Sequence, residues 1–327
     1  MRGAASALLI VLASAPARAD SNDLVMSRLA TPVVNGNGTM SFIGQNLEFR
    51  ELCSQLGVVL APHLLTPADS IGFGGFQIAV DSAYTSIDSS AAYWRVLESS
   101  TDPGATTDGT SHGASTMQTV GLFARKGMWF PIPSFEVGAG AVHLTNSRLW
   151  TGQLYAKFSL HEGYHDLPLP SLSVRGAVSR MMDQRELDLT IASIDVAISK
   201  HIGIGGTWRF DPFVGWNRLI IVPRGEVLDP TQNIDPLVPG NEGASFNNFV
   251  FRDQANIIRD RIFIGTKLQY YVFQLTLEAT FAFAGSSQDT RTGVSMACMP
   301  NSTTADCNAT DVAKQQTTYS LSAGFDF

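Results

Sequence analysis

The chain has 327 residues, of which 29 are acidic and 22 are basic, and its formal net charge at pH 7 is -7. An acidic chain without a cluster of Lys and Arg argues against nucleic acid as a partner, because phosphate binding needs concentrated positive charge. Beyond residue 19, polar residues interrupt every apolar run before it reaches the roughly 18 residues of a membrane-spanning helix, so no such helix is expected.

Residues 1–19 have the features of a secretory signal peptide. Arg2 supplies the positive start, residues 8–12 form a short apolar centre, and Ala17-Arg18-Ala19 matches the small-x-small cleavage pattern. We therefore expect an exported chain whose mature form begins at Asp20.

Residues 20–71 form an N-terminal segment that contains one short amphipathic helix. Leu52, Cys53, Leu56 and Val59 approximate helical spacing, and Asn46 is a plausible residue to cap the helix start. The segment could plug the barrel predicted below, lie beneath it, or have no role in transport. The sequence leaves these alternatives open.

From residue 72 onward, apolar and polar residues alternate. In the last segment, for example, Tyr319 and Leu321 alternate with Ser320 and Ser322. Since a β-strand sends successive side chains to opposite faces, one face of such a strand is apolar and the other is polar. We count ten segments of this kind, at about 72–86, 117–130, 134–146, 149–162, 171–182, 187–201, 207–223, 257–270, 273–285 and 316–327.

Two of these segments are irregular. In 187–201 the apolar residues change phase after Ile191, which predicts a β-bulge at Ala192-Ser193. In 207–223, Pro212 has no backbone N–H to donate, so it should lie at a strand start or at an irregularity.

A soluble sandwich would also alternate, so three further features decide between the two folds. The segments commonly reach ten or more residues, their polar faces combine small residues with full charges, and aromatic residues gather near segment ends. The three longest connections, 87–116, 224–256 and 286–315, also fall on the same side of the sheet, which is the known asymmetry of membrane barrels.

The predicted fold is all-β. An open sheet in hydrocarbon would leave two edges of unpaired backbone groups, and only closure removes both. We expect a closed antiparallel transmembrane β-barrel over residues 72–327, with about ten strands and with eight or twelve as alternatives.

The chain resembles the outer-membrane β-barrel proteins of Gram-negative bacteria. The resemblance rests on the signal peptide and on the alternating final strand, which ends in the aromatic Phe327. It implies a location in outer-membrane lipid, and it implies that Tyr319, Phe325 and Phe327 form an assembly signal for the barrel-assembly machinery. The motif indicates location and no activity.

Charged residues on the polar phase of the strands should face the lumen. They are either a selectivity lining for a pore or a paired network that fills a small barrel, and we favour the network because unpaired interior charge is costly. These residues are Asp81, Arg125, Glu136, Lys157, Arg175, Asp188, Asp211, Arg261, Lys267 and Glu278.

Two motifs suggest chemistry. Residues 161–165 match the zinc-protease string H-E-x-x-H, but Gly163 and the prolines at 168 and 170 leave little room for the helix that the string requires, so we predict no metal site. Cys298 and Cys307 lie in the last long loop, and export to an oxidising compartment favours a disulfide between them.

The function is predicted only in outline. We expect an integral outer-membrane protein with a narrow channel, transport or structural role. One alternative is a cell-surface binding or adhesion protein that acts through its outer loops. A second is an outer-membrane protease or lipid-modifying enzyme, but no spacing groups the loop residues into a catalytic site, so we predict no enzyme and no cofactor.

Overall fold

The computed structural model describes residues 20–34, 36, 40–130, 134–162, 169–228, 248–289 and 310–327. The predicted signal peptide, the predicted disulfide between Cys298 and Cys307, and most of the H-E-x-x-H string lie outside these residues.

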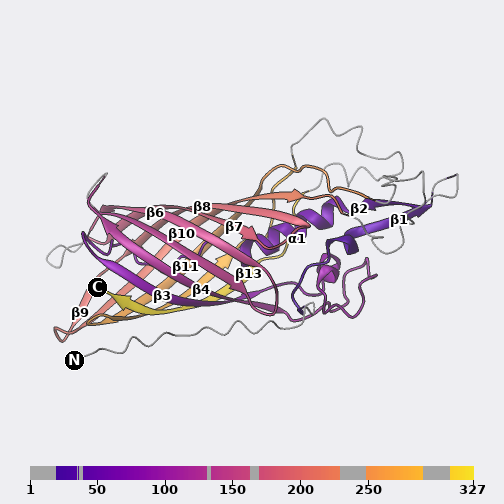
Figure 1. Cartoon of the computed structure of the whole chain (residues 1–327). Coiled ribbons are helices and arrows are strands. Elements are labelled where there is room, and N and C mark those ends of the chain that lie inside the picture. The colour runs from indigo at the N-terminus through magenta and orange to yellow at the C-terminus, as the bar shows by residue number, and fades with distance from the viewer. Residues whose placement is uncertain are drawn as a thin grey trace, which may run out of the picture.

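Ten long strands close into one antiparallel barrel (Figure 1). Strands that follow each other in the chain pair as neighbours, and the last strand pairs with the first to complete the ring. The short β9 (Ile202–Ile204) pairs only with the start of β10. The prediction of a closed ten-stranded barrel is confirmed. The long strands are β3 (Phe76–Ser86), β4 (Thr116–Met128), β5 (Phe135–Leu144), β6 (Trp150–His161), β7 (Ser171–Met182), β8 (Leu187–Ser199), β10 (Trp208–Gly225), β11 (Ile257–Tyr270), β12 (Phe273–Ala282) and β13 (Gln316–Asp326).

The outer wall of the barrel is apolar. Large apolar side chains on the outward phase, such as Leu122, Leu154 and Ile264, are more than half exposed, which suits contact with hydrocarbon. Aromatic residues gather where the chain's carboxyl terminus lies, as an interfacial girdle requires. They are Trp129, Phe130, Trp208, Tyr270, Tyr271, Phe273, Phe325 and Phe327.

The two ends of the barrel differ in their connections. Residues 87–115, 226–256 and 283–315 connect strands at one end, which we call the loop end. The opposite end carries shorter connections, such as 129–134 and 271–272, together with the carboxyl terminus, and we call it the turn end (Figure 1).

The predicted bulge in β8 is wrong. The register of β8 with β7 and with β10 runs without a shift through Ala192-Ser193. Leu187, Leu189 and Ile191 face inward, where they belong to a buried apolar cluster. The apolar phase changes along this strand because its loop-end half has an apolar partner inside the barrel.

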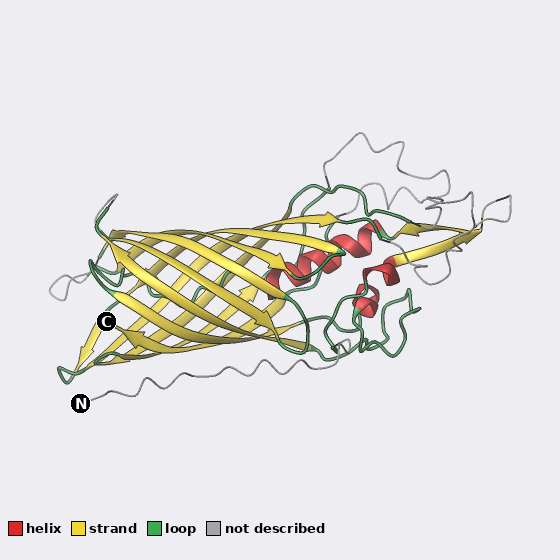
Figure 2. Cartoon of the chain, viewed as in Figure 1, coloured by secondary structure: helices red, strands yellow, loops and turns green. Residues whose placement is uncertain are grey.

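That partner is the N-terminal segment. It forms η1 (Met26–Leu29), a hairpin of β1 (Ala30–Val34) and β2 (Met40–Gly44), and the helix α1 (Asn46–Val59). The hairpin projects beyond the loop end, and α1 runs from there into the barrel (Figure 2). Asn46 is the first residue of the helix and not its cap.

Helix α1 packs closely on the barrel wall. Leu52 and Leu56 are fully buried in one cluster with Leu219 and Ile221 of β10. A Cβ placed on Gly57 would lie 2.5 Å from Cδ1 of Ile221, so glycine permits this approach. In the described part of the chain, no helix is both long and apolar enough to cross a membrane.

Candidate functional site

The lumen of the barrel is occupied by the chain itself. After α1, residues 60–75 follow an irregular path to the turn end, where β3 begins. We call α1 together with residues 60–75 the plug. Because an irregular segment cannot pair its own backbone groups, the barrel wall must supply their hydrogen-bond partners.

Side chains of the wall accept hydrogen bonds from the backbone N–H groups of the plug. The acceptors come from strands around the circumference, or from the residue that follows β6. The pairs are His63 N with Gln153 Oε1 (3.1 Å), Leu65 N with Glu278 Oε2 (2.9 Å), Ala68 N with Ser199 Oγ (3.0 Å), Ser70 N with Glu162 Oε1 (3.2 Å) and Ile71 N with Glu136 Oε2 (3.2 Å).

Cationic side chains of the wall donate to the carbonyl oxygens of the plug. Each of three cations on β4, β6 and β7 reaches at least one carbonyl of residues 63–69, and charge-assisted hydrogen bonds of this kind are the stronger ones. The pairs are Arg125 Nη1 with Leu65 O (3.2 Å), Lys157 Nζ with Pro67 O (3.2 Å) and Asp69 O (2.8 Å), and Arg175 Nη1 with His63 O (3.3 Å) and Leu64 O (2.7 Å).

The same charged residues also pair with one another. Lys157 Nζ lies 3.0 Å from Glu136 Oε2, and Arg175 Nε lies 2.5 Å from Asp195 Oδ2. The hydroxyl of Tyr155 donates to Glu136 Oε1 at 2.6 Å. Buried ions need such complete pairing, since an unpaired charge away from water costs several kcal/mol. The charged side chains of the wall therefore bind the backbone of the plug and also form ion pairs with one another.

Nine of the ten predicted lumen charges face inward and are buried, all except Asp188. The prediction that Asp188 faces the lumen is wrong. It alternates with the inward-facing Leu187 and Leu189, so it lies on the outer face, where Arg180 Nη2 donates to its Oδ2 at 3.0 Å. The predicted bulge had assigned this half of β8 to the wrong phase.

Several inward residues were not predicted. Asp195 pairs with Arg175, and Asn217 on β10 donates to the same carboxylate. With β8 in a single phase, Asp195 falls on the inward side, so regular alternation was the signal that could have found it. Gln153, Ser179 and Ser199 also bind the plug, and nothing distinguishes them in sequence from other polar strand residues.

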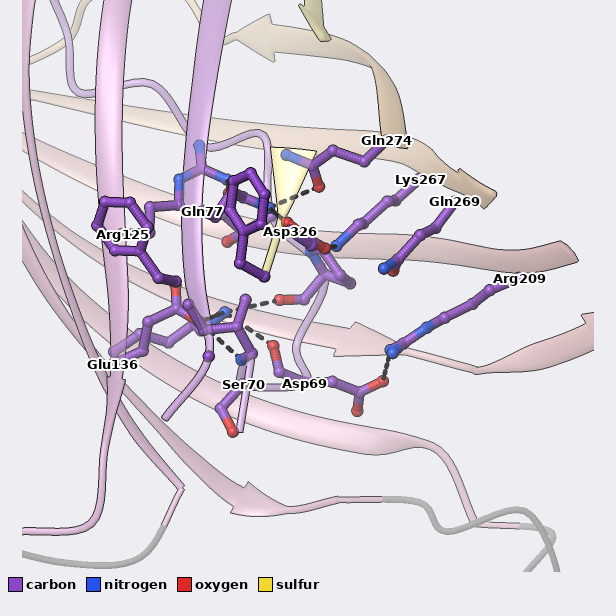
Figure 3. A pocket seen from close by; sticks show the side chains of 17 residues that line it. Asp69, Ser70, Gln77, Arg125, Glu136, Arg209, Lys267, Gln269, Gln274 and Asp326 are labelled. Atoms are coloured by element: carbon purple, nitrogen blue, oxygen red, sulfur yellow. Dashed lines mark hydrogen bonds and ion pairs between the residues drawn. The ribbon is translucent and has the colours of Figure 1, made fainter. Parts of the chain in front are cut away.

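A polar pocket of about 230 Å³ lies beside the plug at the turn end (Figure 3). Arg209, Lys267 and Gln274 reach into it from β10, β11 and β12, opposite Asp69 of the plug. Arg209 Nη2 donates to Asp69 Oδ2 at 3.2 Å, and this pair fastens the plug to the wall.

At the loop end, α1 is fastened to the long connections. Arg50 Nη1 donates to Ala255 O at 2.9 Å, and Ser54 Oγ donates to Asp311 Oδ2 at 2.6 Å. Arg259 Nη1 donates to Ser54 Oγ at 2.8 Å. The helix is therefore held by hydrogen bonds on one side and by the apolar cluster on the other.

Glu51 on α1 should make stability depend on pH. Burial, with the negative charges of Asp311, Asp108 and Glu48, raises the pKa of Glu51 from 4.5 to about 7. The folded state then binds the proton more tightly than the unfolded state, so stability should be fully present below pH 4.5 and fall as pH rises to about 7. The loss is up to about 3 kcal/mol. Denaturant unfolding in detergent at pH 5 and pH 8 measures it.

The matched variants are Glu51→Gln and Glu98→Gln. The first should remove most of the difference between pH 5 and pH 8, because it removes the titrating group. Glu98 lies at the same end of the molecule and is exposed, so its replacement should leave the difference intact. A pH dependence that is unchanged in Glu51→Gln would contradict the assignment.

The residues singled out for chemistry are dispersed. His161 ends β6, and Glu162 accepts a hydrogen bond from Ser70 Oγ at 2.5 Å. Within the described ranges, no three His, Cys, Asp or Glu side chains are grouped as metal ligands would be.

Cys53 is buried in the apolar cluster as a free thiol. Tyr319, Phe325 and Phe327 lie exposed at the outer face of the last strand and its end.

Comparison with known proteins gives a structural similarity only. No protein-family model matches the chain, and no curated protein matches it. Among solved structures, the attachment invasion locus protein Ail of Yersinia pestis, in complex with the heparin analogue sucrose octasulfate, is similar. The identity is 10%, the match covers 78% of this chain and 99% of Ail, and the TM-score is 0.24, which supports no inference about a ligand. The closed barrel with its apolar wall has the architecture of Gram-negative outer-membrane β-barrel proteins.

Proposed function

We propose that the chain is an integral outer-membrane protein whose barrel is closed by its own plug, and that it binds a partner at the cell surface through its loop end. The main support for this proposal is that the N-terminal segment fills the lumen and also forms part of the surface at the loop end.

The outer wall supports the membrane location. The apolar strand faces, the aromatic girdle at the turn end and the longer connections at the opposite end together match a barrel whose loop end faces outward. In this orientation the turn end and the carboxyl terminus face the periplasm, and the N-terminal hairpin lies on the cell surface.

The filled lumen argues against a wide solute channel. Side chains that line a water-filled pore stay accessible to water, as in porins. Here the inward-facing Glu136 and Asp211 are 0% exposed, and Lys157 is 2% exposed. Passage of solutes larger than water through the lumen therefore requires the plug to move.

At the loop end, the N-terminal segment and the first long connection bind each other and form one continuous surface. The isolated bridge between Leu24 and Leu97 connects the N-terminal segment to the first long connection, which contains η2 (Ala92–Val96). Arg28 Nη2 lies 3.1 Å from Glu98 Oε2, and Arg95 Nε donates to Arg28 O at 2.9 Å. Loops that a rigid scaffold positions in this way commonly carry recognition.

The first test concerns the position of the N-terminus. A peptide epitope inserted after Asp20 should bind its antibody on intact cells, because the structure carries this residue to the loop end. An epitope inserted at Tyr271, in the turn-end connection, should be reached only after the outer membrane is permeabilised. The reverse pattern would place the loop end in the periplasm and contradict the proposal.

The second test concerns binding. Cells that display the chain should be retained on some members of an array of immobilised glycans and extracellular proteins. Replacement of residues 30–44 by a Gly-Ser linker should abolish that retention while the barrel stays in the membrane. Equal retention of both cell types on every member would reject a surface-binding role.

A gated channel is the second candidate. The way in which residues 60–75 are held favours this candidate. They bind the wall through hydrogen bonds and ion pairs, which water can replace. The pocket at the turn end also separates part of this segment from the wall. In this case the plug would leave the lumen in response to a signal, and solutes would then pass.

A further inference from the structure

The two sides of the plug meet different walls. On the side of β4 to β8, long charged side chains reach across to the plug backbone. On the side of β12, β13 and β3, Glu278 also binds the plug backbone, but six inward residues carry short hydroxyl side chains. These hydroxyl residues are Thr85, Thr276, Thr280, Thr318, Ser320 and Ser322.

Several buried polar atoms on this second side lack hydrogen-bond partners among the described residues. They include Oγ1 of Thr276, Oγ of Ser322 and both carboxylate oxygens of Asp81, and the three residues are at most 1% exposed. The register places them side by side, with Thr276 opposite Ser322 and Ser322 opposite Asp81. Because a buried polar group without a hydrogen bond destabilises the folded state, we expect water molecules to bind these atoms.

The basic side chains beside Asp81 lie slightly too far away for direct hydrogen bonds. His63 Nδ1 lies 3.6 Å from Asp81 Oδ2, and Arg125 Nη2 lies 3.9 Å from the same oxygen. Polar contacts beyond 3.5 Å are the ones that a bridging water commonly completes.

Two cavities flank this row along the barrel axis. The turn-end pocket is lined by Gln274 of β12 and Asp326 of β13. The other cavity, of about 20 Å³, is lined by Glu278 of β12 and Ser320 of β13, and a single water needs about 10–15 Å³. Thr276 and Ser322 lie between these two pairs on the same strands, so the row with unpartnered atoms occupies the stretch between the two cavities.

The polar path continues toward the loop end on the same side. Nη2 of Arg261, Oε1 of Gln316 and Nε2 of Gln55 are also buried without a hydrogen-bond partner in the described residues. Gln316 Nε2 donates to Gln55 O at 3.3 Å, which brings the path to α1. Beyond it lie Ser54 and Asp311 at the loop end.

We propose that this side of the lumen is a hydrated seam that conducts water past the closed plug. The seam consists of Asp81, Thr276, Glu278, Ser320 and Ser322, with the two cavities beside them. Arg261 and Glu278 line the smaller cavity, and Lys267 and Asp326 line the turn-end pocket, so an ion of either sign meets fixed charge of its own sign, which disfavours ions relative to water. The inference does not rest on surface binding at the loop end.

The test is osmotic water flow into proteoliposomes that contain the full mature chain. Wild-type protein should add a water permeability above that of protein-free liposomes. Ser320→Leu combined with Ser322→Leu should abolish this added permeability, because two Leu side chains fill the seam. Ala323→Leu is the matched control, since it adds the same side chain to the same strand on the outer face and should leave the permeability unchanged.

A cross-link separates the seam from movement of the plug. Ala68 N lies 3.0 Å from Ser199 Oγ, so Ala68→Cys with Ser199→Cys can fix the plug to the wall. The background should lack the three native cysteines. Water permeability that persists in the oxidised, cross-linked protein supports the seam. Permeability that appears only after reduction, or no permeability above empty liposomes for a folded wild-type chain, overturns it.

Discussion

Deletion of residues 20–71 should turn the closed barrel into an ion-conducting pore. The deletion removes α1 and most of the segment whose backbone the wall charges bind, while all ten barrel strands remain. Water would then hydrate Glu136, Lys157 and Arg175, which keep their places on the inward face. In planar bilayers the truncated protein should give stepwise currents, whereas the full chain should give none of that size.

The controls separate an open lumen from a damaged barrel. A variant that keeps the plug but has residues 30–44 replaced by a linker should give no stepwise currents, because the lumen stays filled. Heat-dependent mobility in gels shows whether each variant has folded as a barrel. A correctly folded deletion variant without stepwise currents would show that the wall collapses or that the outer loops close it, and the plug would then not be what seals the barrel.

The strands could be predicted because lipid and lumen impose a period of two on each of them. Their number, order and closure follow from this pattern and from the connection lengths. The exceptions occur where the barrel interior is not polar. Leu187, Leu189 and Ile191 face inward because α1 supplies an apolar partner at that level, and a single strand carries no sign of what lies opposite.

The place of the N-terminal segment could not be predicted for a similar reason. Helical spacing in α1 indicates an apolar face and not the surface that covers it. Residues 60–75 have no periodic pattern, because they bind the wall mainly through backbone atoms that every residue possesses. The inward charges were visible in sequence, but their role as partners of a threaded backbone was not.

Replacement of Arg175 by Met should destabilise the protein by about 3–5 kcal/mol. Arg175 is 4% exposed, donates to two plug carbonyls, and pairs with Asp195 at 2.5 Å. Met fills a similar volume but leaves Asp195 as a buried charge without its cation, and it leaves the carbonyls of His63 and Leu64 without this donor. Denaturant unfolding in detergent measures the loss.

Two further variants show which part of this loss comes from the charge. Arg175→Met combined with Asp195→Leu should be less destabilising than Arg175→Met alone, because the carboxylate that lost its cation is gone. Arg180→Met is the matched surface control, since Arg180 lies on the same strand, is exposed, and pairs with Asp188 on the outer face. Its loss should stay below about 1 kcal/mol. Equal losses for the Arg175 and Arg180 variants would mean that the inward charges do not hold the plug.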